Sequence, residues 1–138
     1  SSNVILAAVN LEATDVEHTR LNIAVIQRAK TLAQLTGMEV ALVSAVSDAV
    51  VFKDYIEDKD VEFSSNEEIV AAYFDLSPDM VYLSKGNTKS TILKAAEKTD
   101  ADIVVIGSVG RKGVKGMLIG NTAEKILYEL VSDVLVVT

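Results

Sequence analysis

Four short apolar runs, separated by longer amphipathic stretches, most constrain how this chain of 138 residues can fold. The runs are continuous rather than alternating with polar residues, and they occupy Val4–Val9, Val40–Val46, Ile103–Ile106 and Val134–Val137. Such runs are typical of strands buried on both faces, as in a parallel sheet between two layers of helices. A weaker fifth strand is predicted over Met80–Ser84.

The stretches between the runs carry helix start signals and helical spacing. Capping boxes, in which a Ser, Thr or Asn stands three residues before a Glu, begin at Thr14, Ser65 and Asn121. With the apolar spacing they predict helices over 14–36, 65 to about 78, 88–99 and 121–131. Strands that alternate with helices predict one α/β domain over residues 1–138, a single doubly wound, five-stranded parallel sheet with about four helices, of Rossmann-like type.

The composition excludes several classes of function. A formal net charge of −7 argues against a nucleic-acid partner, because duplex binding relies on clustered Lys and Arg, and against docking on an anionic membrane. The absence of cysteine excludes thiol redox chemistry and thiolate metal sites. The first apolar run is much shorter than the roughly 20 residues that a membrane span needs. We therefore expect a cytoplasmic protein that acts on neither nucleic acid nor membrane.

Five of the seven glycines lie in the range Gly107–Gly120, between the third apolar run and the helix predicted from Asn121. Glycine allows the backbone to approach a ligand closely, and successive N–H groups can form an anion-binding nest. The N-terminus of the next helix adds unpaired donors and the positive end of its dipole. Arg111, Lys112 and Lys115 add three cations to an otherwise acidic chain. The pattern predicts a phosphate-binding loop.

Ligands of doubly wound sheets bind beyond the carboxyl ends of the strands, where the strand order reverses. That rule directs attention to the residues after Val9, Val46 and Ile106. The acidic segment 49–63 follows the second strand. It could cover the site as a mobile flap, or be a solvated connecting loop, which is the commoner role of such a segment.

The glycine-rich loop matches neither the P-loop nor the dinucleotide-binding fingerprint. It resembles the GxxG-x9-G[ST] loop of universal stress proteins, on whose glycines Gly107, Gly110 and Gly120 fall. The resemblance covers nearly the whole chain, from Val4–Val9 to Ile119–Glu124, and the latter is most similar to the tandem-domain branch of the family. It implies an adenine nucleotide alpha hydrolase-like fold, often dimeric through the last strand. The chain could be one half of a tandem protein or a single-domain relative.

The resemblance also implies a ligand, ATP or a related adenine nucleotide, with or without Mg²⁺. In members that bind ATP, backbone groups at the three glycines of this loop pattern face the phosphates and ribose, and the residue at the end of the second strand contacts the adenine. Carried over to this chain, the expected nucleotide-binding residues are Asn10, Val46, Gly107, Gly110, Arg111, Gly120, Asn121 and Thr122.

Two of these residues depart from the family pattern. Asn121, followed by Thr122, stands where the family has a Ser or Thr, and Asn10 stands where ATP binders have an Asp at the end of the first strand. An amide can hydrogen-bond an adenine amino group, but it brings no charge for a cation. Asn121 would equally serve as an N-cap, and Asn10 could simply tie down the turn after its strand.

No nucleophile–base pair and no metal-ligand cluster stands out, so no catalytic or metal-binding residue is predicted, and ATP hydrolysis is expected to be weak at most. Three functions stay open. The glycines and loop cations favour a nucleotide-binding module in stress response or regulation. Asn10 and Asn121 favour a structural or adaptor member that binds a protein or another small ligand. An ATP-hydrolysing or phosphotransfer enzyme has the least support.

Overall fold

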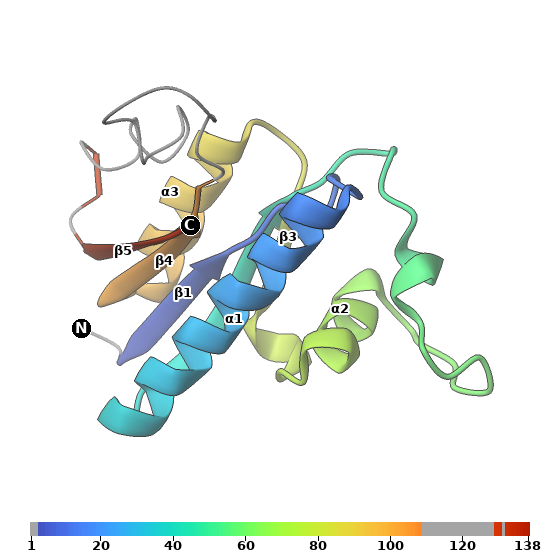
Figure 1. Ribbon diagram of the computed structural model, residues 1–138, viewed down its shortest axis with the longest axis horizontal. Coiled ribbons are helices and arrows are strands. Elements are labelled where there is room, and N and C mark those ends of the chain that lie inside the picture. Colours follow the sequence, from blue (N-terminus) through green and yellow to red (C-terminus); the bar gives the residue numbers. More distant parts are fainter. Residues whose placement is uncertain (1–2, 109–128, 131) are drawn as a thin grey trace.

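Five parallel strands form one sheet in the computed structural model, which describes residues 3–108, 129–130 and 132–138 (Figure 1). The strands lie in the order β3-β2-β1-β4-β5. Their bounds are β1 (Val4–Ala8), β2 (Glu39–Ala45), β3 (Val81–Ser84), β4 (Ile103–Gly107) and β5 (Asp133–Val137). Every neighbouring pair is parallel. The predicted parallel sheet is confirmed, and each strand agrees with its prediction to within one residue at either end.

Helices cover both faces of this sheet (Figure 1). In the described part of the chain they are α1 (Val16–Thr36), α2 (Asn66–Phe74) and α3 (Thr88–Thr99), with two short 3₁₀ helices, η1 (Phe52–Tyr55) and η2 (Pro78–Met80). Residues of α1 and α2 share one apolar core with the sheet, and residues of α3 share the other. The fold is therefore doubly wound, as predicted. The fourth predicted helix lies outside the described residues, apart from residues 129 and 130.

The start of α1 differs from its prediction by one residue. Asp15, not Thr14, is the N-cap, and its carboxylate accepts a hydrogen bond from the backbone nitrogen of His18 at 3.0 Å. The same carboxylate lies 2.8 Å from Nδ1 of His18. These contacts with His18 hold the pKa of Asp15 below its usual value. Asp15 contacts both the backbone and the ring of His18, and it therefore caps the helix in place of Thr14.

The second helix confirms its predicted start and corrects its predicted end. Ser65 is the N-cap of α2 and accepts a hydrogen bond from the nitrogen of Glu68 at 3.1 Å. The helix ends at Phe74, because Asp75 takes a left-handed backbone conformation with φ of 56°. Pro78 was expected to mark the end of this helix, but it begins the separate turn η2, a position that suits its fixed φ.

The apolar character of the strands follows from burial on two sides. In β1, Leu6 faces the core shared with α3, while Ile5 and Ala7 face the core shared with α1 and α2, and none of the three is accessible to solvent. Fully burying a Leu or Ile side chain stabilises a fold by about 1.5–3 kcal/mol. A strand with alternating polar residues would lose that contribution on one face.

The strand order reverses between β1 and β4. From β1 the chain winds outward through β2 to β3, then returns through α3 to β4 on the other side of β1. The carboxyl ends of β1 and β4 therefore lie side by side where the strand order reverses, which is where ligands of such folds bind. We call this place, residues 9–12 and 107–108, the switch point. None of the described helices is long and apolar enough to cross a lipid bilayer.

Candidate functional site

The turn after β1 is held by a buried amide from α1. Asn10 donates its backbone N–H to Oδ1 of Asn22 at 2.9 Å, and Nδ2 of Asn22 donates to the backbone oxygen of Asn10 at 2.8 Å. Asn22 is only 7% exposed. The side chain therefore pairs with both backbone groups of Asn10 as a neighbouring strand would. Asn22 was not among the predicted site residues, although it stands on the helix face that buries Val25, Ile26 and Ala29, and a polar residue on that face was the available signal.

The next residue of the turn, Leu11, is fixed from two other elements. Its N–H donates to Oγ of Ser44 in β2 at 3.2 Å, and its carbonyl accepts the hydroxyl of Tyr55 in η1 at 3.1 Å. Leu11 and Ser44 are each 1% exposed. Burial raises the pKa of Tyr55, so this hydroxyl stays protonated and able to donate at neutral pH. Side chains from α1, β2 and η1 thus fix the backbone of the switch point.

The side chain of Asn10 is exposed and makes a local turn contact. Its Oδ1 accepts the backbone N–H of Glu12 at 3.1 Å, an arrangement in which an Asn side chain stabilises its own turn. No hydrogen bond between described residues uses the amide nitrogen of Asn10. The turn-stabilising role and a ligand-binding role are therefore compatible, because they use different atoms of one amide.

Gly107 ends β4 and lies close against α1. A Cβ atom at this position would lie 2.7 Å from Cγ of Leu21 and 3.1 Å from Cγ2 of Val25. Beyond it, Ser108 donates its N–H to the carbonyl of Val137 at 2.8 Å. Close packing of α1 gives this glycine a structural reason besides the phosphate contact predicted for it.

The predicted site residues are only partly within the described chain. Asn10, Val46 and Gly107 follow or end β1, β2 and β4, and parallel strands bring these three residues to the same edge of the sheet. Val46 is half-buried and donates its N–H to the carbonyl of Ser84 at 2.9 Å, which extends the pairing of β2 with β3. The remaining predicted residues, Gly110, Arg111, Gly120, Asn121 and Thr122, lie outside the described residues.

The acidic segment 49–63 is attached to the switch point at its beginning. Val50, Phe52 and Tyr55 pack against the core under α1 and α2, and the rings of Tyr55 and Tyr73 meet edge-on with centroids 5.0 Å apart. The acidic side chains of the segment are exposed. Its start is therefore fixed by the same tyrosine that fixes Leu11, and its role as a flap stays a prediction.

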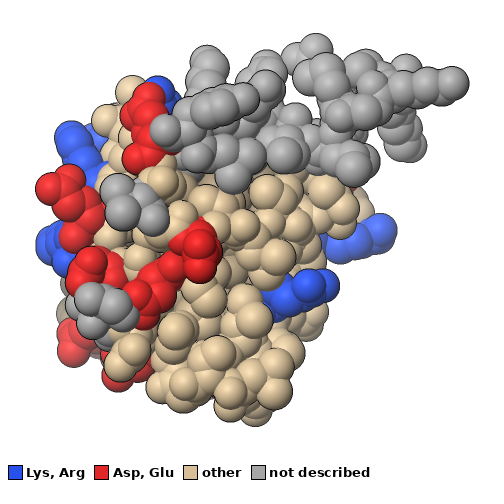
Figure 2. Space-filling view, turned by 90° about the vertical axis from the view of Figure 1, so that its left-hand side faces the viewer, with Lys and Arg blue, Asp and Glu red and all other residues tan. Residues whose placement is uncertain are grey.

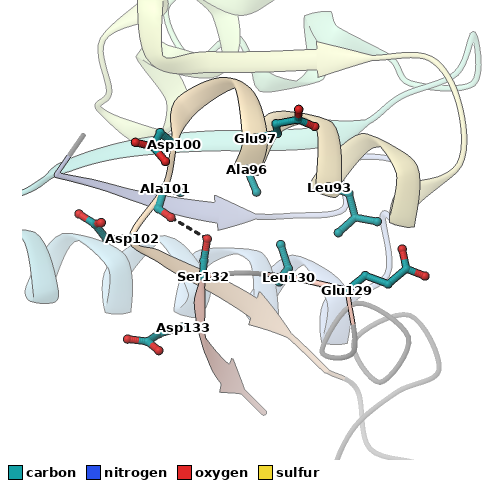
Figure 3. Close-up of a pocket in the computed structure, with 10 residues that line it drawn as sticks. All are labelled: Leu93, Ala96, Glu97, Asp100, Ala101, Asp102, Glu129, Leu130, Ser132 and Asp133. Atoms are coloured by element: carbon teal, nitrogen blue, oxygen red, sulfur yellow. Dashed lines mark hydrogen bonds between the residues drawn. The ribbon is translucent and has the colours of Figure 1, made fainter. Parts of the chain in front are cut away.

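A hollow of about 680 Å³ lies elsewhere, along α3 and the starts of β4 and β5 (Figure 3). Its carboxylates are spread around the hollow rather than pointing to one spot, and they belong to Glu97, Asp100, Asp102, Glu129 and Asp133. Within the described ranges, no group of three or more Asp, Glu or His residues is placed to hold a metal ion. An acidic lining also disfavours an anionic ligand, so the switch point fits a nucleotide better.

The chain is similar to proteins of one family. Residues 13–138 match the Universal stress protein family. Universal stress protein E of Escherichia coli strain K12 is 30% identical over 143 residues, which cover 96% of this chain and 45% of that protein. The chain thus spans about half the length of the curated relatives it matches.

Solved structures share this fold. A functionally unknown protein of Pseudomonas aeruginosa PAO1 is 34% identical, with a TM-score of 0.74 over 97% of this chain and 46% of that chain. A universal stress protein in complex with cAMP is 14% identical, with a TM-score of 0.62 over 97% of this chain and 94% of that one. The universal stress protein of Archaeoglobus fulgidus in complex with dAMP is 19% identical, with a TM-score of 0.57 over 98% and 96%.

Proposed function

The chain belongs to the universal stress protein family, and from that premise we propose that it is a domain that binds an adenine nucleotide at the switch point, in stress response or regulation. The observation that carries this proposal is the fixed backbone of Asn10 and Leu11, which three side chains from different elements hold beside the end of β4. A binding edge that is ordered before the ligand arrives loses less entropy on binding.

Two neighbours of the same fold support the ligand class, since they are described as complexes with cAMP and with dAMP. Both ligands contain adenine and one phosphate. The exposed amide of Asn10 can serve an adenine edge, because an amide offers both donors and an acceptor. We therefore propose an adenine nucleotide as the ligand, and the choice between ATP with Mg²⁺ and a monophosphate is decided by titration.

The test is a titration of nucleotide-stripped protein with Mg-ATP, AMP and cAMP, followed by calorimetry and by thermal unfolding. A ligand present at about 100 times its dissociation constant adds about 2.7 kcal/mol to the free energy of unfolding. The proposal expects such a gain with at least one of the three nucleotides. If none of them shifts the unfolding transition at millimolar concentration, the chain is not a nucleotide-binding domain.

The variant Asn10→Asp tests whether the amide of Asn10 disfavours the Mg²⁺ that accompanies ATP. A carboxylate keeps the oxygen that accepts from Glu12 and adds a charge that favours Mg²⁺. We expect Mg-ATP to bind more tightly to Asn10→Asp than to the parent protein. Asn66→Asp makes the same charge change at an exposed position of α2, so it should leave the affinity unchanged. Equal affinities of all three proteins would mean that position 10 does not contact the ligand.

A second candidate function, an adaptor that acts through protein contacts, is favoured by the edge strand β5, whose outer side pairs with no other described strand. β5 ends the sheet, and Val134, Leu135, Val136 and Val137 are all partly exposed along it. Figure 2 views the side on which β5 lies and shows uncharged side chains over much of it, with acidic ones gathered along one margin. We propose that a second universal stress domain covers this edge, either in a homodimer or as the other half of a longer chain.

Sedimentation equilibrium with Val136→Asp tests this pairing in the chain as it stands. Val136 is half-buried but belongs to neither core, so an Asp there should dissociate a dimer and leave the monomer folded. Leu35→Asp is the control, because Leu35 is an exposed apolar residue near the far end of α1. A chain that is monomeric before any substitution would leave only a tandem partner. A dimer that survives Val136→Asp would rule out the β5 edge as the dimer interface.

We expect the protein to act in the cytoplasm.

A further inference from the structure

We propose that a second site, separate from the switch point, binds a small organic anion with a single charge and an apolar body. The site is a hollow of about 320 Å³ between α3 and the edge strand β3, which we call the α3–β3 hollow. Its size is at the lower end of ordinary ligand pockets, which hold about 300–1,000 Å³. It goes beyond the proposed function, because β2 separates it from β1 and β4.

Two lysines of α3 supply the positive charge. Lys94 and Lys98 stand one helical turn apart and both line the hollow. Neighbouring like charges at this spacing repel each other. Among the described residues neither lysine has a carboxylate within 4.0 Å, although the chain has a net charge of −7. Lys98 lies over the ring of Tyr82, 5.4 Å from its centroid, which places this ammonium group against the wall of β3.

The nearest other lysines show the contrast. Lys85 lies 3.0 Å from a carboxylate oxygen of Asp48, and Lys89, on the same helix as the pair in the hollow, forms an ion pair with Glu129. Both of these lysines already have an anionic partner within the chain. Of these four lysines, Lys94 and Lys98 are therefore the two that would gain an ion pair from an anion bound in the hollow.

The hydroxyl of Thr91 is a third group that suits the same ligand. Thr91 lines the hollow and is only 5% exposed, yet no hydrogen bond between described residues uses its hydroxyl. Its oxygen is not among the fully buried side-chain atoms that lack a hydrogen-bond partner, so a ligand in the hollow can reach this hydroxyl. A carboxylate held by the lysines would accept this hydroxyl as a third donor.

The rest of the lining sets the remaining features of the ligand. Val43, Val81 and Ala95 are buried and line the hollow, so the ligand needs an apolar part to match them. Glu67 also lines it, so two positive charges face one negative charge. One net positive charge suits a monoanion such as a carboxylate, and it disfavours the several charges of a nucleoside triphosphate.

The experiment follows backbone amide shifts of ¹⁵N-labelled, nucleotide-free protein during titration with sodium hexanoate. The proposal expects shifts confined to β3 and to residues 91–98 of α3. 1-Hexanol, which lacks the charge, and inorganic phosphate, which lacks the apolar chain, should both bind more weakly. Absence of shifts at millimolar hexanoate would overturn the proposal, and so would equal binding of hexanoate and hexanol. Neither result bears on the nucleotide titration, which is made at the other site.

Paired variants separate recognition by the hollow from general attraction of anions. The double change Lys94→Gln and Lys98→Gln should weaken hexanoate binding by about tenfold or more, as expected for lost charge-assisted hydrogen bonds. Lys85→Gln with Lys89→Gln removes the same charge from lysines that already have partners, so it should leave the affinity nearly unchanged. Equal losses in the two double variants would show unspecific attraction and overturn the proposal.

Thr91→Val provides a readout in the absence of ligand. If the hydroxyl has no partner, replacing it with a methyl group should leave the unfolding midpoint in urea unchanged or higher, while hexanoate binds several-fold more weakly. A clear loss of stability would show that the hydroxyl is already used within the fold, and a variant with unchanged hexanoate affinity would exclude it from the site. Either outcome would contradict the assignment of Thr91 to the ligand.

Discussion

Replacing Gly107 with alanine adds one methyl group at the point where α1 crosses the end of β4. Gly107 is not among the glycines with positive φ, so alanine can adopt its backbone conformation and the effect is purely one of space. The new methyl carbon would lie 2.7 and 2.9 Å from Cγ and Cδ2 of Leu21, and 3.1 Å from Cγ2 of Val25. Carbon atoms pack best at about 3.5–4.0 Å, so α1 or its side chains must move.

Overpacking of this kind costs about 1–3 kcal/mol. For a domain of this size that corresponds to a fall of roughly 3–10 °C in the unfolding midpoint. The assay is urea denaturation of the ligand-free protein, so that the phosphate contact predicted for this glycine plays no part. Gly107→Ala should therefore lose stability even when no nucleotide is present.

A double-mutant cycle identifies the cause. Leu21→Ala removes the atoms nearest to the new methyl group, so Gly107→Ala should cost much less in that background than in the parent protein. The coupling free energy between the two changes should be about 1 kcal/mol or more. Changes that add to within about 0.5 kcal/mol would refute the packing argument, and a fully stable Gly107→Ala would leave ligand binding as the reason for this glycine.

Three further substitutions test the contacts that hold the turn and the helices. Asn22→Asp should lower the free energy of unfolding by about 2 kcal/mol at neutral pH, because the introduced carboxylate faces the carbonyl of Asn10 without a proton to donate. Urea denaturation should show that part of this loss is regained at acid pH, where the carboxyl group is protonated. Tyr55→Phe removes the bond to Leu11 and should cost about 1 kcal/mol. Burial raises the pKa of Tyr55. The contribution of its hydroxyl to stability is therefore complete below the unfolded-state pKa of about 10 and is lost as the pH rises through the folded-state pKa. The denaturation midpoints of variant and parent should accordingly converge in alkali. Asn87→Ala removes the N-cap of α3 and should cost about 1 kcal/mol by thermal unfolding, whereas an unchanged midpoint would mean that water replaces the cap.

The sequence predicted the five strands and, to within one residue, the starts of the three described helices, because the signals there are local. A strand buried on both faces must be apolar throughout, so the runs that begin at Val4 and Ile103 identified β1 and β4 directly. Ser65 identified the start of α2 because a capping hydroxyl acts only three residues ahead. The alternation of these elements then required a parallel sheet. The one-residue error at Asp15 arose where two adjacent residues could both cap a helix.

The sequence predicted where the switch point lies but not the hydrogen bonds that fix it. Its place follows from the rule that strand order reverses in such sheets, and the order β3-β2-β1-β4-β5 puts it between β1 and β4. The means by which it is held could not be predicted, because the partners are distant in the chain. Asn22 is 12 residues from Asn10, Ser44 is 33 residues from Leu11, and Tyr55 is 44 residues from Leu11.

The sequence by itself thus determined which described segments become strands and helices, the parallel sheet and the family. Only the tertiary structure decided that Gly107 makes room for α1 and that an amide on a buried helix face pairs with the turn after β1. The physical reason is the range of the interactions. Backbone propensity, capping and apolar period act over a few residues and are visible in the sequence. Steric fit and buried hydrogen bonds join residues that become neighbours only when the sheet has formed.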